Sequence, residues 1–274
     1  MASSIELVIK PRKGWQPIDF REAYLYRELL GFLVWRDTKI RYRQTILGGL
    51  WAVLQPLIGM LIFTLIFNRM AGVRSDGPPY PLFAYVGLAP WTFFSNSVTQ
   101  SSNSLIGHQH LVSKIYFPRI FIPLGAIGAL LVDLSVSLCL LAVLMLYYRW
   151  PVSVHLLLLP IFILAAFLSA AGLGLILSAI NVRFRDVKYA VPFLIQMGLF
   201  VTPVIYPARY IPARLLPLVG LNPMAGVVFG FRYCLLGSFV PWRVVEISLL
   251  TSVLVFIAGL LIFRRMERRF ADII

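Results

Sequence analysis

Long runs of apolar residues without charged side chains restrict the fold of this chain more than any other feature. Between Arg43 and Arg69 no residue is charged, and residues 48–68 are almost wholly apolar. A helix rises about 1.5 Å per residue and needs roughly 20 residues to cross a hydrocarbon layer about 30 Å thick, so this run is long enough to span a membrane. The same criterion predicts five further spans, at residues 82–106, 120–148, 155–180, 191–206 and 244–263.

The composition agrees with a membrane protein. Hydrophobic residues make up 59% of the 274 residues and charged residues 13%, against about 45–50% and about 25% in soluble domains. A water-soluble globular domain is therefore excluded. We expect an all-α integral membrane protein with six transmembrane helices, in which residues 1–47 and 264–274 flank a membrane domain at 48–263. We expect no cleaved secretory signal, because the first 47 residues are polar and basic.

The net charge of +14 is better explained by membrane orientation than by nucleic-acid binding, because the basic residues lie at the ends of the apolar runs. An even number of spans places both termini on one side. That side carries 18 of the 25 Lys and Arg residues. By the positive-inside rule, both termini are predicted to be cytoplasmic.

The N-terminal segment contains a predicted amphipathic helix. Asp19 and Glu22 form a plausible capping box at its start. Apolar side chains then follow on one helical face, at Leu25, Leu29, Phe32 and Leu33. Two interpretations remain open: an anchor at the membrane surface, or a collar that meets a partner at the cytoplasmic face.

The cytoplasmic half of the second predicted span is unusually polar. It carries hydroxyl and amide side chains at Ser95, Asn96, Ser97, Thr99, Gln100, Ser101, Ser102, Asn103 and Ser104. Such groups need hydrogen-bond partners or water inside a membrane. They are therefore expected either to pack tightly against another helix or to line a conduit.

Two other spans carry informative residues. Asp133 is acidic near the middle of a span and must be neutral, paired or in contact with water. We favour a structural hydrogen bond over a proton relay, because no other predicted span has a central acid. The fourth span has small residues at a spacing of four, which predicts close helix packing: Ala166, Ala170, Gly174 and Ser178.

The fifth predicted span has only 16 residues, and Pro203 and Pro207 interrupt its outer end. The stretch 208–237 continues apolar but broken, with Asn222 and Pro223 placed as helix N-cap and first helical residue. We therefore expect re-entrant helices before the last span. A metal site at His108 and His110 is disfavoured, because no third ligand lies nearby.

Several short motifs, in their order along the chain, carry a family resemblance. They are WRDTKIRYRQTILG at 35–48, Trp51 with Gln55-Pro56, Val86-Gly87-Leu88 with Pro90-Trp91, KIYFPR at 114–119, NVRFRD at 181–186, and TPVIY at 202–206 with Asn222-Pro223. Over residues 20–265 the chain resembles the permease subunits of bacterial polysaccharide ABC exporters, the type 2 export family. These permeases move O-antigen, capsule or wall teichoic acid chains across the inner membrane.

The resemblance implies a homodimer with a conduit between the two copies, working with two ATP-binding cassette ATPase subunits. A coupling helix that contacts the ATPase subunit is implied at 107–119, with His108, His110, Lys114, Ile115, Tyr116, Phe117, Pro118 and Arg119. An interfacial helix at the cytoplasmic gate is implied at 20–35, and the gate residues that we assign are Tyr24, Arg27, Arg36, Asp37 and Arg41. The segment 208–237 matches the re-entrant helices that close the conduit outside.

Aromatic residues in the spans of this family are associated with the sugar path, since pyranose rings stack on flat side chains. The candidates here are Trp51, Tyr85, Trp91, Phe93, Phe94, Phe200 and Tyr206. Ordinary packing, or the aromatic belt at membrane interfaces, is the alternative role for each of them.

The expected function is ATP-driven export of lipid-linked polysaccharide. The chain lacks a Gly-x-x-x-x-Gly-Lys-Ser/Thr sequence, so ATP and Mg are expected on the partner subunit, with no cofactor or metal in this chain. A lipid or drug exporter of the same superfamily is an alternative. An intramembrane enzyme using Asp133, His108 or His110 is less favoured, because these residues form no nucleophile–base set. A proton-coupled carrier is disfavoured because Asp133 is the single central acid.

Overall fold

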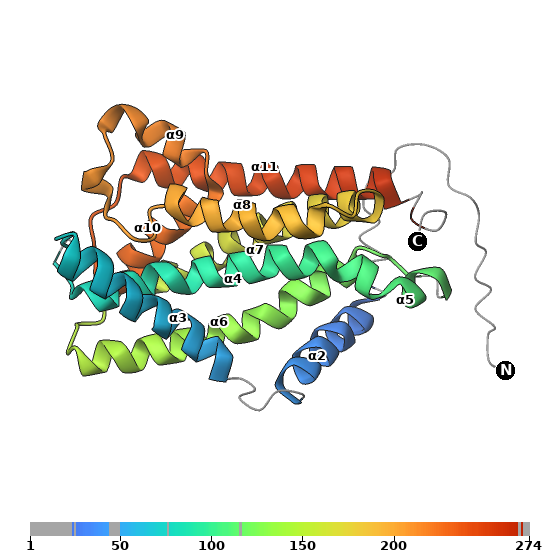
Figure 1. The fold of residues 1–274 in the computed structure, drawn as a ribbon, viewed down its shortest axis with the longest axis horizontal. Helices are drawn as coiled ribbons and strands as arrows, with labels where there is room; N and C mark the ends of the chain where they lie inside the picture. The colour runs from blue at the N-terminus through green and yellow to red at the C-terminus, as the bar shows by residue number, and fades with distance from the viewer. Residues whose placement is uncertain are drawn as a thin grey trace.

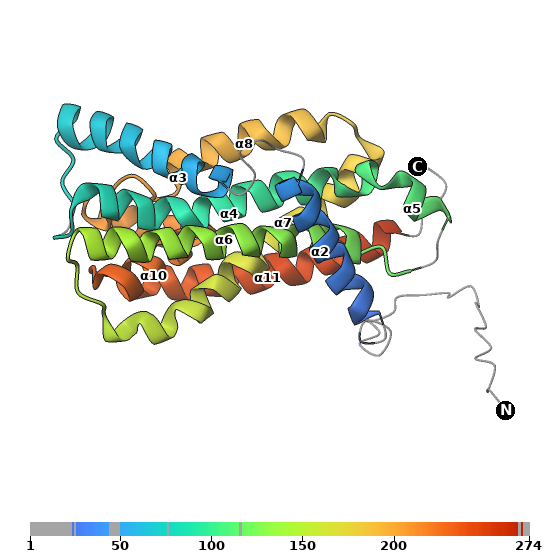
Figure 2. The same cartoon turned by 90° about the horizontal axis from the view of Figure 1, so that it is seen from below.

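The structure, a computed structural model, describes residues 24, 26–43, 50–75, 77–114, 117–267 and 270. Helices account for 84% of these residues, and none of them lies in a strand. The all-helical prediction is therefore confirmed. The long helices run roughly side by side in one elongated bundle, and α2 crosses them obliquely (Figures 1 and 2).

The described elements follow the order of the apolar runs. They are α2 (Arg27–Arg43), α3 (Leu50–Phe63) continuing into the π-helical η1 (Thr64–Met70), α4 (Tyr80–Gly107), α5 (Gln109–Lys114), α6 (Phe121–Tyr147), η2 (Val154–Leu158) leading into α7 (Leu159–Arg183), α8 (Val187–Val201), η3 (Ala208–Tyr210), η4 (Ala213–Leu215), α9 (Leu216–Gly220), α10 (Pro223–Leu236) and α11 (Trp242–Glu267). Figure 1 shows α2, α5 and the C-terminal end of α11 at one end of the bundle, here called the α5 end. The opposite end, which contains α9 and α10, is called the α9 end.

Four helices are long and apolar enough to cross a membrane: Leu50–Met70, Phe121–Tyr147, Val154–Arg183 and Trp242–Glu267. The pair Ala213–Gly220 and Pro223–Leu236 adds a fifth if it counts as one span, and the two helices are bent by 106° at their break. The six-span count and the re-entrant arrangement therefore remain predictions. Of the other predicted spans, α4 is long enough but half polar, and α8 has only 15 residues.

Helix α4 lies at the centre of the bundle and packs against α3, α6, α7, α8 and α10. Its first half supplies buried apolar side chains such as Leu82 and Val86. In its second half, four serines are buried: Ser97, Ser101, Ser102 and Ser104. Asn181 of α7 donates a hydrogen bond to the Ser102 carbonyl at 2.8 Å. The hydroxyls of Ser101, Ser102 and Ser104 donate to backbone carbonyls of α4 itself, whereas the buried Ser97 hydroxyl has no hydrogen-bond partner among the described residues.

Small residues bring α7 close to its neighbours. The four small residues at a spacing of four are all buried, and a Cβ atom added at Gly174 would lie 2.1 Å from Ser101 Oγ. On another face of α7, a Cβ atom at Gly172 would lie 2.5 Å from the Val255 carbonyl oxygen of α11. Backbone contact this close is the usual reason for small residues between membrane helices.

The predicted start of α10 is confirmed. The Asn222 side chain accepts a hydrogen bond from the Met224 amide at 3.0 Å, and Pro223 is the first helical residue. Gly237 follows the helix with a φ of 65°, which glycine adopts without strain. Helix α8 ends at Val201 rather than at residue 206, because the chain turns at Thr202, where Pro203 cannot continue the backbone hydrogen bonding.

Candidate functional site

The site forms where α2 is held against α6. A Cβ atom at Gly125 would lie 3.0 Å from Leu33 Cβ, and one at Gly128 would lie 2.6 Å from Val34 Cγ2, so these glycines let α2 approach closely. Helix α2 begins at Arg27 and extends to Arg43, beyond the end at residue 35 that the sequence predicts. The predicted capping box at Asp19 and Glu22 lies outside the described residues.

Asp133 of α6 lies beside the C-terminal end of α2, and two residues of α2 contact its carboxylate. Arg41 Nη1 lies 2.5 Å from Asp133 Oδ2, and the Tyr42 hydroxyl donates to Asp133 Oδ1 at 2.6 Å. Arg41 also donates to the Gln100 side chain. Asp133 is therefore paired, which is one of the three states that the sequence allowed.

The environment of Tyr42 keeps its hydroxyl protonated. Burial, followed by the hydrogen bond to Asp133 and the charge of that carboxylate, raises the pKa of Tyr42 to about 12. The phenol therefore stays a hydrogen-bond donor throughout the physiological pH range. Together, Arg41 and Tyr42 neutralise and hydrogen-bond the one acidic group at this level of α6.

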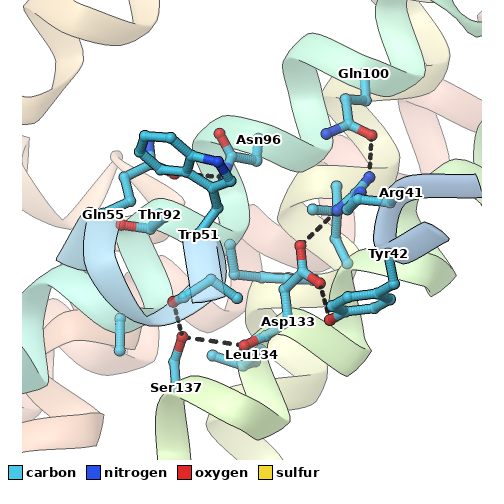
Figure 3. Close-up of a pocket in the computed structure, with 14 residues that line it drawn as sticks. Arg41, Tyr42, Trp51, Gln55, Thr92, Asn96, Gln100, Asp133, Leu134 and Ser137 are labelled. Atoms are coloured by element: carbon cyan, nitrogen blue, oxygen red, sulfur yellow. Dashed lines mark hydrogen bonds and ion pairs between the residues drawn. The ribbon is translucent and has the colours of Figure 1, made fainter. Parts of the chain in front are cut away.

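A cavity of about 320 Å³ opens beside this ion pair. Its walls come from α2, α3, α4 and α6, and its polar lining residues include Gln55, Thr92, Asn96, Gln100 and Ser137. Figure 3 shows Asp133 and Gln100 both directed toward Arg41, while Trp51, Gln55, Thr92 and Asn96 gather on the other side of the pocket. Small-molecule sites occupy about 300 Å³ or more, so the cavity reaches the size of a binding site.

The chemistry of the cavity suits binding rather than catalysis. Amide and hydroxyl groups can donate and accept hydrogen bonds, and the Trp51 side chain is 53% exposed. The titratable lining residues are Arg41, Tyr42 and Asp133, and the first two both donate to the Asp133 carboxylate. Within the described part of the chain, no group of three or more His, Cys, Asp or Glu residues could hold a metal ion.

The structure separates the seven aromatic candidates. Trp51 and Phe93 line the cavity. Tyr85, Trp91 and Phe94 are buried in the core of this chain, where the Tyr85 hydroxyl donates to the Ser137 carbonyl at 3.1 Å. Phe200 is exposed on α8, and the Tyr206 hydroxyl donates to the Phe200 carbonyl at 3.3 Å. The cavity thus brings together two of the seven candidates.

The candidate coupling segment contains a six-residue helix, α5. Ile115 and Tyr116 lie outside the described residues, as does the side chain of Lys114. Phe117 is buried, next to Pro118 in the turn before α6, and the Arg119 guanidinium donates to the Glu267 carbonyl oxygen at 2.9 Å. Arg119 therefore ties this segment to the end of α11.

The gate candidates extend along α2. Arg27 lies over the Tyr24 ring at 4.0 Å, and Arg36 pairs with Asp37 at 2.8 Å. Arg36 also contacts His108, and Arg41 binds Asp133 as described. The structure therefore joins two of the five gate candidates to residues outside α2: Arg36 to His108 between α4 and α5, and Arg41 to Asp133 of α6.

Two groups of site residues were not assigned from the sequence. Gln55 was named only within a family motif and Thr92 was not named, although an amide at Gln55 within an apolar run was a usable signal. Arg232 of α10 was also missed. It is 2% exposed, donates to the Pro203 carbonyl at 2.7 Å and to the Val204 carbonyl at 2.5 Å, and lies 3.5 Å from the centre of the Phe83 ring. This buried arginine fixes the turn after α8 against α4 and α10.

Several long apolar helices around a buried polar centre define a multi-pass helical membrane protein. Residues 28–236 match the family described as ABC-2 type transporter, and the chain belongs to that family. It is 38% identical over 216 residues to the O-antigen export system permease protein RfbA of Myxococcus xanthus, which covers 77% of this chain and 82% of that relative.

Two further relatives show the range of the similarity. The chain is 30% identical over 256 residues to the O-antigen export system permease protein RfbA of Klebsiella pneumoniae, covering 92% of this chain and 96% of the relative. It is 24% identical over 235 residues to the polysialic acid transport protein KpsM of Escherichia coli, covering 85% and 91%. The resemblance to polysaccharide export permeases is therefore confirmed.

Proposed function

We propose that this chain is the channel-forming membrane subunit of an ATP-driven exporter that moves a lipid-linked polysaccharide across the cytoplasmic membrane. The polysaccharide is of the O-antigen, capsule or teichoic acid type. The observation that carries this proposal is the similarity to O-antigen export permeases over almost the whole length of both chains. A family match alone supports transport but leaves the cargo open.

The cavity beside Asp133 supports a sugar cargo. Sugars offer many hydroxyl groups and flat apolar faces, and the cavity offers amides at Gln55, Asn96 and Gln100 beside the exposed indole of Trp51. A lipid or drug exporter remains the second candidate. The polar lining favours a sugar, because an apolar cargo would leave the remaining donors and acceptors of these amides without partners, which is costly.

The working assembly contains two copies of this chain and two ATPase subunits that carry ATP and Mg. Helices α3 and α8 lie on the same side of the bundle (Figure 2) and expose large apolar side chains such as Leu61 and Phe193, which suits contact with a second copy. Six spans, cytoplasmic termini, re-entrant α9 and α10, a coupling helix at α5 and a gate helix at α2 complete the proposal. The α5 end then faces the cytoplasm.

Deletion of the gene in its host tests the function. We expect surface polysaccharide to disappear and lipid-linked glycan to accumulate inside the cell, and we expect a plasmid copy to reverse both changes. Purification of the tagged chain should bring down an ATPase subunit. Normal surface polysaccharide together with a changed distribution of membrane lipids would instead favour the lipid exporter.

A further inference from the structure

A polar contact joins α2 to the point where α4 meets α5. His108 follows the last residue of α4, with non-helical backbone angles of −117° and 27°, and precedes Gln109, the first residue of α5. Arg36 Nη2 lies 2.7 Å from His108 Nε2, across 72 residues of sequence.

The partners of His108 determine where its proton lies. His108 Nδ1 is 2.8 Å from the Ser104 carbonyl oxygen, which can only accept a hydrogen bond. Arg36 can only donate, so Nε2 must be the acceptor and Nδ1 must carry the hydrogen. Arg36, His108 and the last turn of α4 therefore form one directional chain of hydrogen bonds. Asp37 Oδ1 fixes the guanidinium by accepting from Arg36 Nε at 2.9 Å and from Nη2, the nitrogen that also contacts His108, at 2.8 Å.

An apolar cluster supports the same connection. Leu105 of α4 and Phe117 are buried in it, and Leu29 of α2 and Leu111 of α5 pack against it. Both helices therefore share a packed surface beside the polar contact.

Helix α2 also reaches the cavity. Arg36 and Arg41 are five residues apart, about 7.5 Å along a helix, and Arg41 lines the cavity and binds Asp133. Helix α2 thus contacts the α4–α5 junction through Arg36 and the polar cavity through Arg41.

We propose that Arg36 and His108 are positioning residues that transmit the displacement of α5 to α2 and so to the Arg41 side of the cavity. This inference rests on the proposed function, in which an ATPase subunit moves α5. Loss of the contact leaves ATP hydrolysis running but separates it from export.

The test uses the complete transporter, with the variants His108→Ala, Arg36→Ala and the double variant introduced in the host. The matched control is Lys39→Ala, which removes another cation from α2 whose ammonium lies 4.4 Å from the Trp35 ring. Surface polysaccharide is measured on cells of each variant, and the ATPase rate is measured on the complex purified from the same cells. The quantity compared is the first divided by the second, each relative to the wild type. We expect each single variant to lower this ratio about tenfold, the double variant to be no worse than either, and Lys39→Ala to match the wild type.

The variant His108→Gln adds a rescue. Its amide oxygen can accept from Arg36 and its NH₂ can donate to Ser104, so we expect most of the export per ATP to return. Wild-type ratios in both alanine variants overturn the proposal, and so do losses that multiply in the double variant. Failure of rescue by His108→Gln does the same.

Hydrogen exchange of α2 in the purified wild-type and His108→Ala complexes gives a readout that needs no cargo. We expect α2 to exchange about tenfold faster in the variant. Equal exchange overturns the contact itself. A wild-type complex that exports no polysaccharide, but whose α2 responds to His108→Ala, would refute the proposed function and leave the contact standing.

Discussion

Removing the Asp133 carboxylate should release the C-terminal turns of α2 from α6. The Arg41 and Asp133 side chains have relative solvent-accessible areas of 26% and 19%. The pair is therefore neither a surface salt bridge nor a fully buried one. Surface pairs contribute about 0–1 kcal/mol, and deleting one partner of a buried pair costs about 3–5 kcal/mol. Asp133→Ala also leaves the Tyr42 hydroxyl without its acceptor. We therefore expect a loss of about 2 kcal/mol in the attachment of α2.

Hydrogen exchange measures this loss directly. A cost of about 2 kcal/mol lowers protection by roughly 30-fold, since each 1.4 kcal/mol is a factor of ten. The effect should appear in the amides of residues 35–43 and be smaller for Asp133→Asn, whose oxygen still accepts from Tyr42. Ser135→Ala is the control, because Ser135 lies on the same helix and donates to the Leu131 carbonyl within it. Unchanged protection in Asp133→Ala would refute the assignment of Asp133 as the anchor of α2.

Three further predictions concern packing and the cavity. Gly172→Ala should lower the thermal unfolding temperature, at a cost of about 1–3 kcal/mol, because its Cβ meets the Val255 backbone, whereas Gly31→Ala, with nothing within 4 Å, should not. Trp51→Ala should reduce export without changing the unfolding temperature, because Trp51 lines the cavity and is exposed. Phe94→Ala should instead destabilise the fold by about 3–5 kcal/mol, because Phe94 is buried. Arg232→Met should speed hydrogen exchange at Val204 and Ile205, because it removes the hydrogen bonds to the Pro203 and Val204 carbonyls. Each of these bonds contributes about 1.5–3 kcal/mol. Unchanged slow exchange at these two residues would show that other contacts hold the turn.

The helices could be predicted from the sequence because uncharged apolar runs of sufficient length have few alternatives in a membrane. Their ends were predicted well where a local signal exists, as at Asn222 and Pro223. The end of α2 was predicted too early. Its last turns are held by Asp133, about 90 residues away in sequence, and periodicity within a helix contains no information about such a contact.

The candidate site was predictable only in part. A central acid predicts that Asp133 is neutral, paired or in contact with water, but the choice among these states and the identity of Arg41 as its partner required the structure. The aromatic candidates show the same limit, because Phe93 and Phe94 are neighbours in sequence, yet only Phe93 lines the cavity. Both are buried in the core. Successive residues of a helix point about 100° apart, and composition does not say which direction meets the cavity.

The two polar faces of α4 bear on how such a permease can diversify. Ser97, Ser101 and Ser104 are buried, and Ser101 lies in the seam with α7, where even a methyl group at Gly174 has no room. Asn96 and Gln100 belong to the adjoining face, which opens to the cavity. Mutations on the open face can change the chemistry of the cavity lining without disturbing the seam. The lining can therefore vary while the residues that hold α4 against α7 stay unchanged.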